Sequence, residues 1–483
     1  MNFTFQQLNY ACQIKLALLS LLIMQTSCTH QPYQAKPLNP AAVNAKLANK
    51  DATSADFKSY LSRLGYAQAD DKNKLPFAEW GIDELTLCAL YFNPTLDVAK
   101  AQLVLAGINV STADQRQSPT ISGRTARSNQ ANGDKSPWAF GLEVEIPIET
   151  TNKRQIKVEE AQYLKEVARL DVADVAWQLR SKIAKDLLDF HENIAQQQQL
   201  NSELIIQNSL VQMLQKRAQL GATSNTELNA AKLLQQKSQF LLNSEQSKSV
   251  QMRVALAADV GLSDEKFALL QLKPLDIEAA LLTAPSPPQL QQKALLNRLD
   301  IRRGLAKYGA AESKIKLEIA KQTPDISLSP GFAFEFGDSI WSLGFATLLN
   351  LLNKNATLIA QATQLREIEG AQFEALQAGV IADANLANAA FVASQQHVTQ
   401  LRQQLAAQQQ VTQKLQRQLE AGQLDRYELS QNKLITSLLQ QQLLIAKFKQ
   451  LNALVALENS VQMPLNTNNI LGNKTIQLQR VIE

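Results

Sequence analysis

The stretch that decides the fold of this chain is Trp138-Ala139-Phe140-Gly141-Leu142-Glu143-Val144-Glu145-Ile146-Pro147-Ile148. Its apolar residues occupy every second position, and this alternation is typical of a β-strand with one apolar face. Its eleven residues also match the length of a transmembrane β-strand, about 9–11 residues. A strand of a soluble β-sandwich shows the same alternation, so the rest of the chain has to decide between the two.

A very long helix is predicted directly after this strand. No proline occurs between Ile148 and Lys273, and the glycines of that region are Gly221 and Gly261. Apolar residues recur there at helical spacing, at Val172, Val175, Leu179, Ile183, Leu187, Phe190 and Ile194; this spacing indicates one buried helix face. A helix over residues 153–220 is about 100 Å long at 1.5 Å per residue.

The chain contains two copies of one unit, about 200 residues apart. The strand entry Pro119-Thr120-Ile121-Ser122 returns as Pro324-Asp325-Ile326-Ser327, an offset of 205. Trp138 and Gly141 return at an offset of 203 as Trp341 and Gly344. The pairs with an offset of 201 are Asn152 and Asn353, Lys153 and Lys354, Gly221 and Gly422, Glu227 and Glu428, Leu228 and Leu429, and Lys232 and Lys433. Because the offset shrinks in two steps, we expect short deletions in the connecting loops.

Each copy therefore contains two strands and a long helical hairpin. In the second copy, alternating Phe332, Phe334 and Phe336 precede a predicted turn at Gly337-Asp338-Ser339, and a long helix is expected at about residues 355–421. The fold class is mainly α with a small β part. The expected organisation is a signal peptide (1–27), an N-terminal extension (28–92), repeat 1 (93–273), a linker (274–297), repeat 2 (298–464) and a C-terminal tail (465–483).

The amino terminus predicts export. Residues 16–24 are apolar except for Ser20, which is too short for a spanning helix and typical of a signal-peptide core. The following Gln25-Thr26-Ser27-Cys28 resembles the lipobox of bacterial lipoproteins, so Cys28 is the predicted lipidation site. Cleavage by the ordinary signal peptidase is the alternative.

Composition argues against several classes of function. The net charge is +4 and forms no basic stripe, so nucleic acid is not an expected partner. Three cysteines and three scattered histidines provide neither a disulfide framework nor a local metal cluster. We find no glycine-rich phosphate loop and no Ser/His/acid motif, so we predict no enzyme activity, no cofactor and no metal site.

Four strands cannot close a barrel, because the smallest membrane barrels use eight. An open sheet edge within lipid leaves backbone groups without hydrogen-bond partners, at several kcal/mol each. Several chains must therefore share one barrel if these strands span a membrane.

The ordered set of motifs resembles the TolC-like outer membrane factor family, over about residues 80–464. The matching features are Asn93-Pro94, the two Pro-x-Ile-Ser entries, the Gly221/Glu227 and Gly422/Glu428 tips, and Arg298-Leu299-Asp300-Ile301 where the family commonly has Arg-Pro-Asp-Val. The departures are Leu299 in place of proline and Leu419 where the family often has tyrosine.

The resemblance implies a homotrimer with a twelve-stranded barrel in the bacterial outer membrane and a barrel of long helices in the periplasm. Such a protein contacts outer-membrane lipid, a periplasmic adaptor (membrane fusion protein) and an inner-membrane transporter of the RND or ABC type. It serves as a passive efflux channel for substrates that the transporter delivers. The alternatives are the outlet of a type I protein secretion system and a coiled-coil scaffold without a pore.

Three groups of site residues follow. Alternation on the first strand places Glu143 and Glu145 in the channel lumen if Trp138 and Phe140 face lipid. The predicted adaptor-contacting tips are Gly221, Ala222, Thr223, Gly422, Gln423 and Leu424. The predicted periplasmic gate consists of Glu428, Gln431 and Glu227.

A purely structural role is the alternative for the two glutamates. Ser224-x-x-Glu227 and Asp425-x-x-Glu428 have the spacing of capping boxes, which satisfy amide groups at a helix start. Each glycine before them fits the left-handed position just past a helix end.

Overall fold

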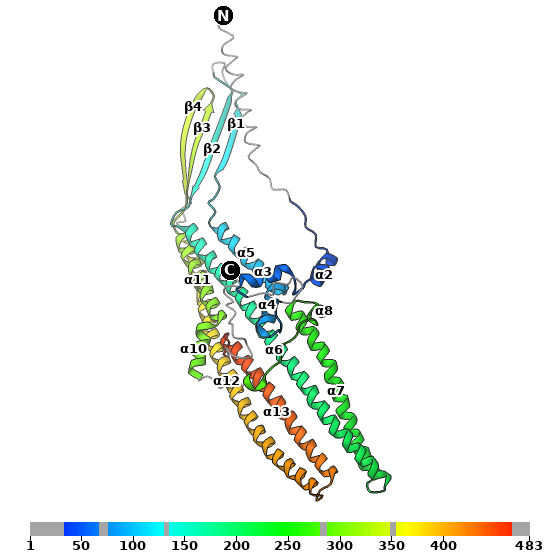
Figure 1. The fold of residues 1–483 in the computed structure, drawn as a ribbon. Helices are drawn as coiled ribbons and strands as arrows, with labels where there is room; N and C mark the ends of the chain where they lie inside the picture. Colours follow the sequence, from blue (N-terminus) through cyan, green and yellow to red (C-terminus); the bar gives the residue numbers. More distant parts are fainter. Residues whose placement is uncertain (1–32, 67–75, 130–134, 281–286, 348–353, 466–483) are drawn as a thin grey trace. The chain divides into compact units, whose positions relative to one another are not determined.

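The structure is a computed structural model that describes residues 33–66, 76–129, 135–280, 287–347 and 354–465 (Figure 1). It divides into two compact units, residues 1–49 and 50–483. The described part of the first unit holds helix α2 (Pro40–Ala48), whose first amides are capped by the Asn39 side chain. The predicted signal peptide and Cys28 lie outside the described residues.

The second unit contains the same series of elements twice. After α3 (Ala55–Arg63) and α4 (Ile82–Phe92), the first series is α5 (Pro94–Ala113), β1 (Thr120–Arg127), β2 (Trp138–Ile148), α6 (Lys153–Gln219) and α7 (Asn225–Val260). Short helices α8 (Asp264–Phe267), α9 (Ile277–Ala280) and α10 (Pro287–Asn297) follow. The second series is α11 (Leu299–Ala320), β3 (Ile326–Glu335), β4 (Asp338–Thr347), α12 (Ala356–Glu420) and α13 (Arg426–Val461).

The two very long helices are confirmed, with 67 residues in α6 and 65 in α12. Each begins after an asparagine in the left-handed conformation, Asn152 (φ 54°) and Asn355 (φ 57°). These are equivalent positions with an offset of 203, so the expected matches of Asn152 with Asn353 and of Lys153 with Lys354 are wrong. The offset therefore falls from 203 to 201 within the long helices, because α12 is two residues shorter than α6. This deletion does not lie in a connecting loop.

The four strands form one antiparallel sheet in the order β1-β2-β3-β4. Leu142 lies opposite Gly123 on β1 and opposite Phe332 on β3, and Phe332 lies opposite Trp341 on β4. Residues directly opposite each other share a face of the sheet. The alternation that the sequence shows on β2 therefore continues across the other strands.

The turn between β3 and β4 lies earlier than expected. Phe336 and Gly337 have φ values of 50° and 114°, and they connect the paired residues Glu335 and Asp338. Two central residues with positive φ are typical of a two-residue hairpin turn. Asp338 and Ser339 already pair with β3, so the predicted turn at Gly337-Asp338-Ser339 begins one residue and ends two residues too late.

The long helix α6 lies between two sets of neighbours (Figure 1). It packs against α5 and α7 of its own repeat, and also against α11 and α13 of the second repeat. Helix α12 in turn packs against α11 and α13. Helices α6 and α7 form hairpin 1, and helices α12 and α13 form hairpin 2.

In each repeat, the end of the hairpin's second helix meets the start of a shorter helix. In repeat 1, the Asn93 side-chain amide before α5 donates to the backbone carbonyl of Asp259 in the last turn of α7, at 2.8 Å. In repeat 2, the Arg298 guanidinium before α11 donates to the backbone carbonyl of Ser460 in the last turn of α13, at 3.1 Å. We call these contacts junction 1 and junction 2.

The largest apolar cluster surrounds junction 1. Phe57 and Leu61 of α3, Leu85 and Cys88 of α4, and Leu256 of α7 are all fully buried in it. Helices α6, α8 and α13 add further side chains to the cluster. Among the described helices, none combines the length and the apolar character that crossing a membrane requires.

Candidate functional site

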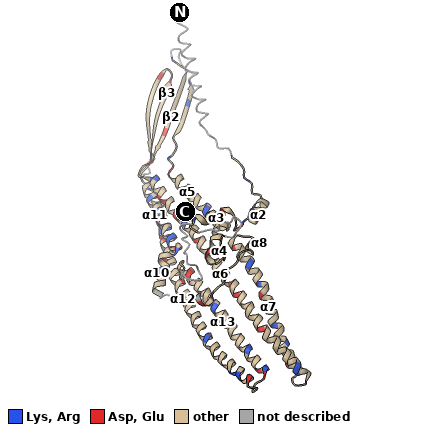
Figure 2. Ribbon diagram, viewed as in Figure 1, with Lys and Arg blue, Asp and Glu red and all other residues tan. Residues whose placement is uncertain are grey.

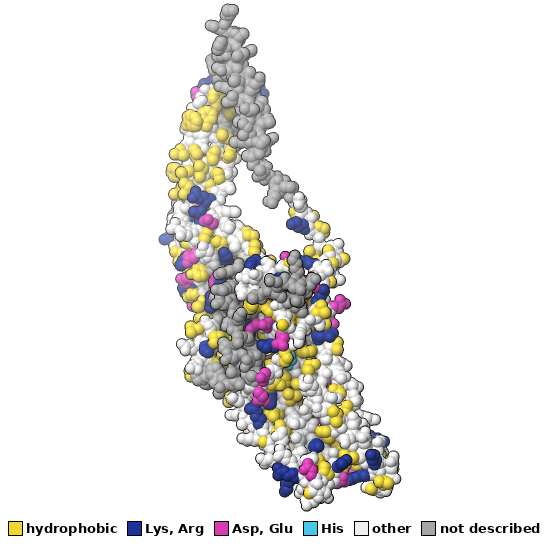
Figure 3. Space-filling model, in the orientation of Figure 1, with side chains coloured by type: hydrophobic (Ala, Val, Ile, Leu, Met, Phe, Trp, Pro, Cys, Tyr) yellow, Lys and Arg dark blue, Asp and Glu magenta, His cyan; other side chains and the backbone are white. Residues whose placement is uncertain are grey.

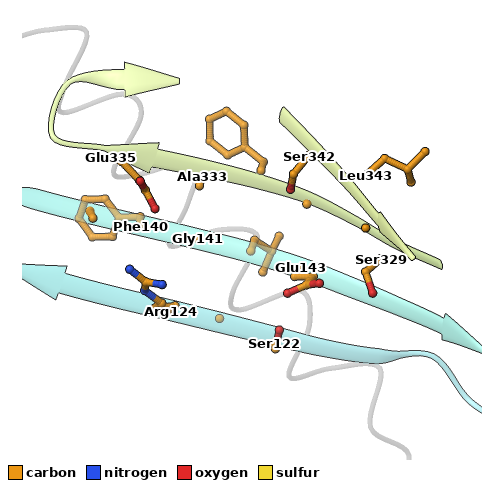
Figure 4. A pocket seen from close by; sticks show the side chains of 16 residues that line it. Ser122, Arg124, Phe140, Gly141, Glu143, Ser329, Ala333, Glu335, Ser342 and Leu343 are labelled. Carbon is orange, nitrogen blue, oxygen red and sulfur yellow. The ribbon is translucent and has the colours of Figure 1, made fainter. Parts of the chain in front are cut away.

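One face of the sheet carries most of its polar side chains and every charged one except Arg127. Glu143 lies opposite Ser122 on β1 and opposite Gly331 on β3, and Glu145 lies opposite Thr120. Arg124, Glu335 and Asp338 occupy the same face, together with glycine, alanine and serine residues and one isoleucine, Ile340. Part of this face lines a hollow, through Ser122, Arg124, Glu143, Ser329, Glu335 and Ser342, and apolar residues such as Phe140 and Phe332 complete its lining (Figure 4).

The opposite face of the sheet is apolar and exposed. Phe140, Leu142 and Trp138 of β2 are 53%, 55% and 44% exposed, although all three are large and apolar. On β4 the same face carries Trp341, Leu343 and Phe345, with exposures of 74–81%. Figure 3 shows hydrophobic side chains gathered over the strands. This face is covered by nothing in the described chain, and its burial requires an apolar surrounding such as lipid.

The hairpin tips have the backbone that the sequence predicts. Gly221 (φ 69°) and Gly422 (φ 72°) are left-handed residues just past the ends of α6 and α12. Ala222 and Thr223 complete the turn of hairpin 1, and Gln423 and Leu424 complete that of hairpin 2. Except for half-buried Thr223 and Leu424, these tip residues are exposed.

The two predicted capping boxes form only in part. Ser224 caps α7 by accepting from the Glu227 amide at 3.1 Å, but the Glu227 carboxylate accepts from the Thr223 hydroxyl instead of the Ser224 amide. Asp425 caps α13 by accepting from the Tyr427 amide at 3.1 Å, so it does not reach the amide of Glu428. The Glu428 carboxylate, which would accept from the Asp425 amide in a complete capping box, makes no hydrogen bond with the described residues.

A network of side chains connects the two tips. The Tyr427 hydroxyl on α13 donates to the Glu227 carboxylate on α7 at 2.8 Å, and it accepts from the Gln431 amide at 2.6 Å. Arg217, near the end of α6, pairs with Asp425, and its guanidinium lies 5.0 Å from the centre of the Tyr427 ring. Figure 2 shows charged residues of both signs at the α12–α13 turn.

The network stabilises a charged Glu227 beside a neutral tyrosine. Hydrogen bonds from Thr223 and Tyr427 lower the pKa of Glu227 below its ordinary value. Partial burial and the hydrogen bond to Glu227 raise the pKa of Tyr427. The hydroxyl therefore stays protonated and remains a donor to the carboxylate.

Of the three predicted gate residues, the structure brings two together. Tyr427 connects Glu227 with Gln431, whereas the exposed carboxylate of Glu428 has no hydrogen bond or ion pair within the described part of the chain. Sequence reasoning missed Arg217 and Tyr427, and it treated Asp425 only as a cap. A comparison of the two repeats could have pointed to Tyr427. Repeat 1 has Asn225-Thr226 at the tip where repeat 2 has Arg426-Tyr427, so the two tips differ there in size and charge.

No three His, Cys, Asp or Glu side chains come together as a possible metal site in the residues that the structure describes.

No protein-family model and no curated protein matches this sequence. Solved structures do match. The outer membrane protein VceC from Vibrio cholerae is 18% identical, with a TM-score of 0.64 over 80% of this chain and 97% of VceC. CusC, which forms a transmembrane channel, is 17% identical, with a TM-score of 0.66 over 90% of this chain and 99% of CusC. The outer-membrane channel OprN is 16% identical, with a TM-score of 0.64 over 90% of this chain and 99% of OprN.

These similarities extend over nearly the whole length of each solved protein. Because the sequence identities are only 16–18%, they are evidence for the fold and not for the function. The mainly helical architecture with a small β part, expected from the sequence, is confirmed. The chain has the fold of the outer-membrane channel proteins VceC, CusC and OprN.

Proposed function

We propose that this protein is the outer-membrane channel of a tripartite efflux system, in which three copies form one conduit. The observation that carries the proposal is the two-faced sheet. On β2, β3 and β4, one face carries large apolar side chains that are exposed. The other face is mostly polar. A coiled-coil scaffold needs no such sheet, and a soluble sandwich would cover its apolar face.

The free sheet edges support assembly. Within the described chain β1 pairs only with β2, and β4 pairs only with β3. If β4 of one copy pairs with β1 of the next, each backbone edge gains a partner and the sheet closes. The number three comes from the resemblance, which gives a barrel of twelve strands.

The internal duplication supports the same assembly in the helical region. Helix α6 packs against the α11 and α13 of the following repeat, whereas the corresponding side of α12 has no such neighbour in the described chain. The equivalent position is open to α5 and α7 of a second copy. Exposed apolar side chains on those two helices, such as Val104 (63%), Leu233 (67%) and Phe240 (70%), are then buried.

Cysteine labelling in intact outer membranes tests the channel. Glu143→Cys should react with a small membrane-impermeant thiol reagent, because Glu143 and Glu145 line the lumen. Its neighbour Leu142→Cys should not react, because it faces lipid. The parent protein gives the background, and equal labelling of the two variants would rule out the barrel.

We propose further that the tip network holds the periplasmic end closed. Glu227, Tyr427 and Gln431 join hairpin 1 to hairpin 2, and Glu428 contributes a free negative charge to the constriction. Tyr427→Phe removes both hydroxyl bonds and should raise the single-channel conductance in planar bilayers. Tyr163→Phe, on α6 away from the tips, is the matched control and should leave the conductance unchanged.

The charge of Glu428 has its own test. Three such carboxylates around an axis favour cations, so Glu428→Gln should lower the cation-to-anion permeability ratio of the purified channel. An unchanged ratio would exclude Glu428 from the gate. The exposed tip residues, including Gly221 and Gln423, are the proposed contact for a periplasmic adaptor that connects the channel with an inner-membrane RND or ABC transporter.

A further inference from the structure

Two aspartates lie together where hairpin 1 is attached at junction 1. Asp186 is on α6, and Asp259 is in the last turn of α7, where its own backbone carbonyl accepts from Asn93. The ammonium group of Lys182 forms an ion pair with Asp259 and lies 3.5 Å from a carboxylate oxygen of Asp186. The side chains of Asp259 and Asp186 are only 13% and 24% exposed.

The two carboxyl groups lie close together, because both are within ion-pair distance of the same Lys182 ammonium group. Oδ2 of Asp259 is buried and accepts no hydrogen bond from the described residues. An ionised carboxylate only accepts, whereas a protonated one also donates. A proton held by Asp186 therefore supplies the donor that the pair lacks.

We propose that Asp186 and Asp259 form a pH-dependent clasp between α6 and the end of α7, closed when the pair shares one proton and weakened when both groups are ionised. The charged groups that act most on Asp186 besides Asp259 are Lys182 and Lys185 of α6. The Lys50 ammonium group also lies at junction 1, where it donates to the Phe92 carbonyl. Lys185 is already paired with Asp189 at 3.0 Å, so Lys182 is left as the main compensating charge. From the α5 side, the contact comes from the neutral amide of Asn93.

The direction of the pH effect follows from the position of Asp186. Burial above all, and then the hydrogen bond and charge of Asp259, raise the pKa of Asp186 from 3.8 to about 6, against the opposing charges of Lys182 and Lys185. A raised pKa in the closed clasp means that the closed form binds the proton more tightly than the open form. The clasp is thus fully stabilised below the ordinary pKa and loses that stabilisation as the pH rises through about 6.

Repeat 2 has no such clasp. Ser460 stands in the place of Asp259, at the offset of 201, and Ala389 stands in the place of Asp186, at the offset of 203. Junction 2 is instead fastened by Arg298, which remains charged throughout this pH range. Only hairpin 1 should therefore change its attachment with pH.

Hydrogen exchange measured by mass spectrometry on the full-length protein in detergent tests the clasp. After correction for the intrinsic pH dependence of exchange, protection of residues 250–261 should fall several-fold, up to about tenfold, between pH 5 and pH 7.5. Residues 451–462 at the end of α13 are the internal reference and should show no comparable change.

Variants locate the effect. Asp186→Asn and Asp259→Asn should each make the protection of residues 250–261 independent of pH. Glu159→Gln, on α6 but far from the pair and bound to Lys316, should retain the wild-type difference. A pH difference that persists in Asp186→Asn, or wild-type protein whose two regions respond alike, would overturn the clasp. The wild-type comparison decides by itself if a variant fails to fold, and none of these outcomes depends on channel activity.

Discussion

The two junctions make the same contact with different chemistry. In both, the side chain that precedes the shorter helix donates to a carbonyl in the last turn of the hairpin's second helix. Junction 1 uses the short amide of Asn93, and junction 2 uses the long guanidinium of Arg298. The duplicated fold therefore requires a donor at this place, and it does not require a particular residue.

The difference in side-chain length is matched by a difference in backbone distance. At junction 1 the backbones are so close that a Cβ atom on Gly261 would lie 2.8 Å from the carbonyl carbon of Phe92. At junction 2 the residue equivalent to Gly261 is Gln462, whose side chain accepts from the Leu299 amide at 2.6 Å and donates to Asp174 at 3.0 Å. Junction 1 thus depends on close backbone packing, and junction 2 depends on polar and charged side chains.

The largest expected effect is that of Gly261→Ala. The new methyl group collides with backbone atoms of Phe92 and Asn93, and the left-handed φ of 82° adds strain. Strain of about 1–2 kcal/mol and overpacking of about 1–3 kcal/mol add up to a loss of about 2–5 kcal/mol. The loss should appear as a lower thermal unfolding midpoint, followed by circular dichroism of the purified protein in detergent.

Gly422→Ala is the matched control for this prediction. Gly422 has a similar φ of 72°, but a Cβ there meets no atom within 4 Å. Its substitution should cost only the backbone strain, about 1–2 kcal/mol. Equal losses for the two variants would show that close packing at junction 1 has no energetic role.

The next largest loss of stability is expected for Arg298→Ala, and it should exceed the loss caused by Asn93→Ala. The Arg298 side chain is 14% exposed and forms ion pairs with Asp300 at 2.6 Å and Asp383 at 3.5 Å. Arg298→Ala leaves the nearly buried Asp300 without its partner, and we expect a loss of about 2–4 kcal/mol in unfolding free energy. Asn93→Ala removes a helix cap and one junction bond, for about 1–2 kcal/mol.

Salt dependence sharpens this comparison. Because the partners of Arg298 are charged, the difference between wild type and Arg298→Ala should shrink at high salt concentration. The difference between wild type and Asn93→Ala should not change. A salt-independent effect of Arg298→Ala would mean that its bond to the Ser460 carbonyl dominates the junction.

The sequence predicts the long helices and the strands because single periodicities run through them. The alternation from Trp138 to Ile148 and the helical spacing from Val172 to Ile194 are properties of consecutive residues, and neither depends on a partner. The cap at Asn93 is visible for the same reason. Its bond to the Asp259 carbonyl is not, because the partner lies 166 residues away.

The candidate site likewise has features that the local sequence predicts and contacts that depend on distant partners. The left-handed glycines at the tips follow from local helix-end rules. The contact between Tyr427 and Glu227 joins residues 200 positions apart, and only the packing of α6 against α13 brings them together. The capping spacing of Asp425 and Glu428 was misleading because Asp425 caps the nearer amide of Tyr427.

The smallest expected effect is the pH response of the tips, which should be opposite in sign to that of the Asp186–Asp259 clasp. The pKa of Glu227 is lowered, so its bonds are fully present above its ordinary pKa of 4.5 and are lost as the pH falls through the lowered value. Hydrogen exchange corrected for intrinsic rates should therefore show slightly weaker protection of residues 218–228 at pH 4 than at pH 6. We expect a change of less than about twofold, because exposed charged contacts contribute little. Glu227→Gln should remove the change and Glu428→Gln should keep it, since the Glu428 carboxylate bonds to no residue in the described ranges. If Glu428→Gln also removed the change, the acid response would belong to the ring of free carboxylates and not to the bond between Tyr427 and Glu227.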